Sequence, residues 1–188
     1  MEKIFISADE LLQDSFRLAL KIYESGYRPT FIAGVWRGGA PIGIAVQEIL
    51  ESFDCPTDHI AIRTSSYGGG MEQAKTVKVF GLEHLTDNIN RDDKLLIIDD
   101  TFDSGRSIAA IIDRLKARCR LNMPEDIKVA TVYFKPALNQ TDREPDFYMH
   151  QTDKWLVFPH ELRGCTKEEL KTRKNLPAEF HQYLKDFK

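Results

Sequence analysis

The sequence has few cysteines and no excess of basic charge. Its three cysteines, Cys55, Cys119 and Cys165, are far apart and form no CxxC pair, so neither a disulfide framework nor a zinc site is expected. The formal net charge is -3, which gives no overall reason to expect nucleic acid or an anionic membrane surface as a partner. Any anion bound by this chain is therefore expected to occupy a local site.

Long apolar runs are also missing. The segment MEKIFISADELLQ has acidic residues among its apolar ones, and no later run approaches the length of a transmembrane helix. We therefore expect a cytoplasmic chain with no signal peptide and no membrane partner. Its 188 residues, 42% of them hydrophobic, are enough to bury one core, and a single domain over residues 1–188 is expected.

Strand and helix patterns alternate along the chain. Helical spacing of apolar residues predicts helices over 8–25, 42–53 and 108–119. Short apolar runs predict strands over 30–35, 60–63, 77–80, 94–98, 128–134, 147–149 and 155–158. Residues 65–70, which include three glycines, predict a mobile loop, and the charged tail from Thr166 is expected to be mostly helical. This alternation predicts an α/β domain.

The strongest motif is KLLIIDDTFDSGRS, residues 94–107. Its apolar strand brings Asp99 and Asp100 to the edge where ligands bind in open α/β sheets. A loop of small residues then enters a helix, whose first N–H groups have no partner within the helix. The motif predicts a cup for a phosphate monoester beside carboxylates that bind a sugar or a hydrated Mg²⁺. The structural alternative is that Asp103 or Ser104 simply caps the helix.

This string resembles the phosphoribosyl-diphosphate signature of the type I phosphoribosyltransferases: a hydrophobic run, two acids, and an acid followed by a small hydroxyl residue, glycine and another hydroxyl residue. The resemblance implies a mostly parallel twisted sheet flanked by helices, with a small hood of terminal segments over the base. The spacing is most similar to short microbial xanthine-guanine or hypoxanthine enzymes, which are usually homodimers or homotetramers. The implied reaction joins phosphoribosyl diphosphate and a purine base, giving nucleoside monophosphate and pyrophosphate in purine salvage.

The resemblance also implies which residues bind phosphoribosyl diphosphate, the donor of the phosphoribosyl group. Arg37, Gly38 and Gly39 follow the first predicted strand, residues 30–35, where the family has its pyrophosphate loop. Adjacent glycines expose N–H groups, and arginine supplies a forked cation; a plain glycine-rich turn is the structural alternative. Asp99 and Asp100 are implied to hold the ribose hydroxyls and Mg²⁺. The implied phosphate-binding residues are Thr101, Ser104, Gly105, Arg106 and Ser107, and Asp103 is the family's proposed general base.

Further residues match the family's base site. In 6-oxopurine members a lysine, here Lys135, bonds the purine carbonyl, and an aromatic residue, here Trp155, stacks on the base beside the residue matched by Leu156. An ammonium suits a carbonyl oxygen, and a large ring offers a flat apolar face. Glu161 matches a carboxylate near the metal, although aspartate is common there.

Ser66 and Tyr67 lie where the family has its flexible catalytic loop. Closing such a loop excludes water from the reaction.

Two other functions stay open from the sequence. One is a non-catalytic regulator that senses phosphoribosyl diphosphate, and the other is a phosphoribosyltransferase for a different acceptor. The chain has no separate nucleic-acid-binding segment and keeps the base-site candidates, which favours the purine enzyme. The sequence does not distinguish hypoxanthine, guanine and xanthine.

Overall fold

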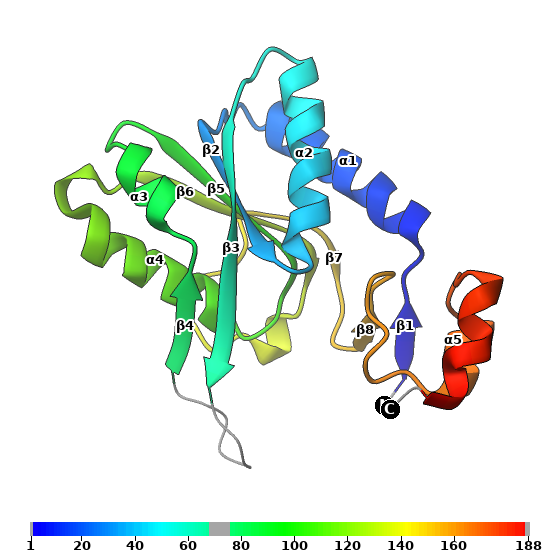
Figure 1. The fold of residues 1–188 in the computed structure, drawn as a ribbon. Coiled ribbons are helices and arrows are strands. Elements are labelled where there is room, and N and C mark those ends of the chain that lie inside the picture. The colour runs from blue at the N-terminus through cyan, green and yellow to red at the C-terminus, as the bar shows by residue number, and fades with distance from the viewer. Residues whose placement is uncertain (1, 68–75, 187–188) are drawn as a thin grey trace. The chain divides into compact units, whose positions relative to one another are not determined.

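The computed structural model describes residues 2–67 and 76–186. The chain divides into two compact units. The larger unit is Asp14–Asp153, and the smaller one combines the terminal segments Met1–Gln13 and Lys154–Lys188. Figure 1 shows the elements of both units.

A mostly parallel sheet forms the centre of the larger unit. Its strand order is β4-β3-β2-β5-β6-β7, and all neighbours are parallel except β3 and β4. The strands are β2 (Phe31–Trp36), β3 (Asp58–Tyr67), β4 (Thr76–Phe80), β5 (Lys94–Phe102), β6 (Asp126–Phe134) and β7 (Phe147–Gln151). The carboxyl ends of β2, β3, β5 and β6 therefore share one edge. This sheet confirms the predicted α/β fold.

Helices flank the sheet (Figure 1). The elements are α1 (Ala8–Glu24), α2 (Gly39–Ser52), α3 (Glu83–Asn88) and α4 (Arg106–Cys119), with short 3₁₀ turns η1 (Arg120–Asn122) and η2 (Pro136–Leu138). On α4, Ile108, Ile111 and Leu115 share one face and pack with Ile97 of β5 in the core. This packing fixes α4 against the sheet and so determines the position of the turn before it.

The largest differences from the predicted strands are at the carboxyl ends of β5 and β3. β5 continues to Phe102 instead of ending at residue 98, because it stays paired with β6 as far as Phe134. β3 extends to Tyr67 because its last residues pair with β4; cross-strand pairing overrides the weak strand preference of serine. The loop predicted from residue 65 therefore begins after Tyr67, and residues 68–75 lie outside the described part of the structure.

The terminal segments pair within the smaller unit. β1 (Lys3–Phe5) and β8 (Trp155–Val157) form a two-stranded parallel sheet. Helix α5 (Lys167–Thr172) starts with a capping box, and the 3₁₀ helix η3 (Ala178–Asp186) follows it, so the tail is mostly helical as predicted. Strand β1 was not predicted, because its three residues are too few for a hydrophobic pattern. That this unit is a hood over a base site stays a prediction.

Among residues 2–67 and 76–186, none of the helices has the length and apolar character needed to span a membrane.

Candidate active site

Three predicted segments of the larger unit meet at the carboxyl edge of its sheet. The turn after β2 carries Gly38 and leads into Gly39 at the start of α2, β5 carries the two acids near its carboxyl end, and Lys135 directly follows β6. The segments are in contact: Lys135 N donates a hydrogen bond to Phe102 O at 2.9 Å, and the glycine loop packs on Asp100. This edge is where ligands bind in open α/β sheets, and it forms the candidate site.

The turn between β5 and α4 forms a small cup. Gly105 is the N-cap of α4, its φ is 73°, and no side chain caps the helix. The first helical bond runs from Ala109 N to Gly105 O at 3.0 Å, so the preceding N–H groups point out of the helix. A cavity of about 70 Å³ lies there, lined by Asp99, Thr101, Phe102, Asp103, Ser104, Gly105, Ser107 and Ile108. The arrangement suits a phosphate group.

Polar side chains around the cup also suit a phosphate group. The buried hydroxyl of Thr101 has no hydrogen-bond partner among the residues that the structure describes, and a buried donor of this kind is usually satisfied by water or a ligand. Asp103 is exposed, whereas Ser104, Arg106 and Ser107 are partly buried. The helix-capping alternative for Asp103 or Ser104 is not what the structure shows, because the N-cap is a glycine.

The loop after β2 rests on the acid pair. Gly38 and Gly39 are buried, whereas Arg37 is exposed. A Cβ added to Gly38 would overlap the carboxylate of Asp100, and one added to Gly39 would overlap the carbonyl oxygen of Ile98. Close approach to the backbone of β5 therefore requires glycine at Gly39, and at Gly38 a larger residue would displace the Asp100 side chain. The backbone of this turn lies next to the carboxylates.

Asp99 and Asp100 are partly buried neighbours at the end of β5. Burial, and then the charge of Asp100, raise the pKa of Asp99 well above its usual value. The pair is therefore unfavourable as two negative charges unless a cation lies nearby. Within the described residues, no three His, Cys, Asp or Glu side chains cluster so that they could hold a metal ion. Two carboxylates do suit Mg²⁺, which commonly completes its shell with substrate phosphates and water.

The remaining predicted residues are placed as follows. Ser66 and Tyr67 end β3, but their side chains lie outside the described part of the structure. Trp155, Leu156 and Glu161 belong to the smaller unit. Trp155 is 52% exposed and Leu156 is buried, while Glu161 Oε2 accepts a hydrogen bond from Phe158 N at 3.1 Å. Their predicted roles toward the base and the metal stay predictions.

One part of the site was missed at the sequence level. Gln140 N donates to Ser104 O at 3.1 Å, and a Cβ added to Gly105 would lie 2.5 Å from Thr141 Oγ1. The segment after Lys135 therefore packs directly on the phosphate cup. The only signal for it was a run of turn-forming residues, Asn139 among them, and such a run does not specify a contact about thirty-five residues away along the chain.

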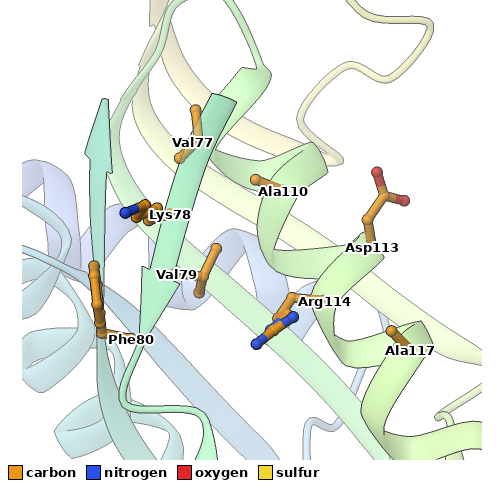
Figure 2. A pocket seen from close by; sticks show the side chains of 8 residues that line it. All are labelled: Val77, Lys78, Val79, Phe80, Ala110, Asp113, Arg114 and Ala117. Atoms are coloured by element: carbon orange, nitrogen blue, oxygen red, sulfur yellow. The ribbon is translucent and has the colours of Figure 1, made fainter. Parts of the chain in front are cut away.

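A larger hollow of about 620 Å³ lies between β4 and α4 (Figure 2). It is lined by Val77, Lys78, Val79, Phe80, Ala110, Asp113, Arg114 and Ala117. None of the residues predicted from the motifs lines it, so the cup and the acid pair remain the candidate site.

A model of the phosphoribosyl transferase domain family matches residues 7–163. The bifunctional protein TilS/HprT of Listeria monocytogenes serotype 4b (strain F2365) is 28% identical over 150 residues, which are 78% of this chain and 21% of that protein. The chain thus spans about a fifth of the length of the curated relatives it matches.

Solved structures show the same fold. The purine phosphoribosyltransferase from Pyrococcus horikoshii Ot3 has a TM-score of 0.70 and 27% identity, over 88% of this chain and 98% of that one. The xanthine-guanine-hypoxanthine phosphoribosyltransferase of Helicobacter pylori has a TM-score of 0.63 and 20% identity, over 84% and 92% of the two chains.

Proposed function

The chain belongs to the phosphoribosyl transferase domain family, and from this premise we propose that it transfers the 5-phosphoribosyl group of phosphoribosyl diphosphate to a 6-oxopurine. Hypoxanthine, guanine and xanthine are the candidate bases, and the products are the nucleoside monophosphate and pyrophosphate, as in purine salvage. The observation that carries the proposal is the uncapped start of α4, which lies beside the acid pair and the glycine loop. Release of pyrophosphate in the presence of a base tests it.

The donor is held through its three charged or polar parts. The cup anchors the 5′-phosphate through N–H groups of α4, and Asp99 and Asp100 accept hydrogen bonds from the ribose hydroxyls. Arg37 and the amides of the glycine loop stabilise the negative charge that grows on the departing diphosphate. Mg²⁺, when bound near the acid pair, adds positive charge for the same purpose. The two carboxylates also favour the positive charge that develops at the anomeric carbon.

Roles in the smaller unit and the β3–β4 loop complete the proposal. The exposed ring of Trp155 is proposed to stack on the purine beside Leu156, and Glu161 is proposed to bind the metal. Ser66 and Tyr67, which end β3, are proposed to bind substrate and to help exclude water from the reacting groups. A homodimer or homotetramer is the proposed assembly.

Asp103 is proposed to act as general base for the purine nitrogen, since it is an exposed carboxylate lining the cup. Asp103→Asn keeps the shape but cannot accept the proton, so kcat at neutral pH is expected to fall about 100-fold with little change in the KM for phosphoribosyl diphosphate. Steady-state kinetics measures both. Asp113→Asn, which alters an exposed acid of α4, is the control and should leave both constants unchanged. Near-normal turnover by Asp103→Asn would remove this role.

Lys135 is proposed to bond the purine 6-carbonyl. Lys135→Ala keeps the backbone bond to Phe102 O but loses the ammonium. The KM for hypoxanthine or guanine is expected to rise about 10- to 100-fold, since a hydrogen bond to a charged group contributes about 1.5–3 kcal/mol. Adenine, which lacks the carbonyl, serves as the comparison base, and Lys116→Ala on α4 as the control variant. Equal losses for bases with and without the carbonyl would contradict this role.

A further inference from the structure

The segment that follows Lys135 is bonded to the phosphate-binding turn at two points. Lys135 N donates to Phe102 O at 2.9 Å, and Gln140 N donates to Ser104 O at 3.1 Å. Ser104 directly precedes Gly105, the N-cap of α4, and Phe102 is the last residue of β5 before this turn. Because the turn binds its ligand with backbone groups, the support behind this backbone decides where those groups point.

Asn139 holds this segment in its shape. Its Oδ1 accepts hydrogen bonds from the N–H and from the hydroxyl of Thr141, both at 3.0 Å, and its Nδ2 donates to Arg143 O at 2.9 Å. The Arg143 guanidinium in turn donates to Ile127 O of β6. The segment is therefore closed on itself and fixed to the sheet.

Thr141 lies directly against the turn. Its Oγ1 would be 2.5 Å from a Cβ on Gly105, on the same side as the Phe102 ring at 2.9 Å. The hydroxyl therefore occupies the space where another residue's side chain would begin. Because Thr141 and the Phe102 ring both lie this close, the backbone at Gly105 has little room to move toward them.

We propose that Asn139 and Thr141 are positioning residues that brace the phosphate-binding turn. This inference rests on the proposed function of that turn. The two side chains act through Ser104 and Gly105 rather than on the ligand, and they keep the N–H groups at the start of α4 directed toward the 5′-phosphate. Loss of the brace lets the turn relax, which weakens phosphate binding without removing any binding group.

The test compares two probes that bind different parts of the site. Ribose 5-phosphate reports on the cup, and inorganic pyrophosphate with Mg²⁺ reports on the glycine loop. Titration calorimetry is expected to give an about tenfold weaker affinity of Asn139→Ala and Thr141→Val for ribose 5-phosphate, because each variant loses hydrogen bonds that hold the segment in shape against the turn. Affinity for pyrophosphate should be unchanged, and Thr141→Ser should restore ribose 5-phosphate binding.

Thr30→Val is the matched control. The Thr30 hydroxyl donates to Asp93 Oδ1 at 2.8 Å at the opposite edge of the sheet, where β2 and β5 begin. This variant loses a comparable loop hydrogen bond and should keep both affinities. Melting temperatures of all variants show whether a loss of affinity reflects unfolding.

Several outcomes overturn the brace. These are an unchanged affinity of Asn139→Ala and Thr141→Val for ribose 5-phosphate, or an equal loss for both probes. If the protein transfers phosphoribosyl groups but these variants bind ribose 5-phosphate normally, only the role of Asn139 and Thr141 is rejected. If the protein transfers to no base but Asn139→Ala weakens ribose 5-phosphate binding, the role of Asn139 and Thr141 is supported and the proposed function is rejected. Absence of ribose 5-phosphate binding by the unsubstituted protein contradicts both.

Discussion

Replacing Gly105 with alanine is expected to raise the KM for phosphoribosyl diphosphate about 100-fold. Gly105 has a φ of 73°, where a residue with a Cβ is less stable by roughly 1–2 kcal/mol. The new Cβ would also lie 2.5 Å from Thr141 Oγ1 and 2.9 Å from the Phe102 ring. Relief of both contacts moves the start of α4 and its N–H groups, and each 1.4 kcal/mol lost is about tenfold in affinity. Initial rates at varied donor concentration measure the effect.

Gly26→Ala is the control that distinguishes the effect of backbone strain from the effect of the close contacts at Gly105. Gly26 has a φ of 82° and nothing within 4 Å of an added Cβ, and it follows the end of α1. This control should destabilise the fold by about 1 kcal/mol and leave the KM unchanged. A Gly105→Ala protein with the donor affinity of the unsubstituted chain would show that the turn does not bind the phosphate.

The glycine pair after β2 is expected to respond to alanine in two different ways. At Gly38 the added Cβ meets the side chain of Asp100, which can rotate away, so the protein should fold but lose about 100-fold in kcat. At Gly39 the added Cβ meets the backbone of Ile98 and Asp99, which cannot move without distorting β5. Gly39→Ala should therefore be less stable by about 1–3 kcal/mol. Thermal melts and turnover numbers measure the two effects.

Gly43→Ala is the control for this pair. Gly43 lies within α2, and an added Cβ would be 3.8 Å from Gly34 Cα, an ordinary contact. Because alanine favours a helix over glycine by up to about 1 kcal/mol, this variant should be as stable as the unsubstituted chain or slightly more. Full turnover by Gly38→Ala would contradict the role given to the contact between the glycine loop and Asp100.

The turn between β5 and α4 was predictable because the residues that form it are consecutive in the sequence. A continuous apolar run predicts the buried strand β5, and the following acids, serines and Gly105 predict a ligand-binding turn. The carboxyl end of β2 could likewise be matched to the glycine pair. What the sequence could not give is the reason for those glycines, since the contact of Gly38 with Asp100 depends on the strand order.

Features that depend on distant partners were missed. The three residues of β1 become a strand only through pairing with β8, and β3 extends only because β4 lies beside it. The brace at Asn139 and Thr141 depends on the β6 segment folding back onto the turn after β5. Hydrophobic periodicity carries no information on such contacts.

One local feature was also not predicted. Ser7 and Glu10 form a capping box at the start of α1, and a serine followed three residues later by glutamate is a pattern that a sequence can show.

Pyrophosphate release tests the central claim most directly. The protein is incubated with phosphoribosyl diphosphate, Mg²⁺ and, one at a time, hypoxanthine, guanine, xanthine, adenine, uracil and orotate. A purine phosphoribosyltransferase should give stoichiometric pyrophosphate and nucleoside monophosphate with at least one 6-oxopurine, and no release when Mg²⁺ or the base is omitted. Binding of phosphoribosyl diphosphate without release for any base would contradict the proposed function and favour a sensor. Release with a pyrimidine alone would contradict the assigned base.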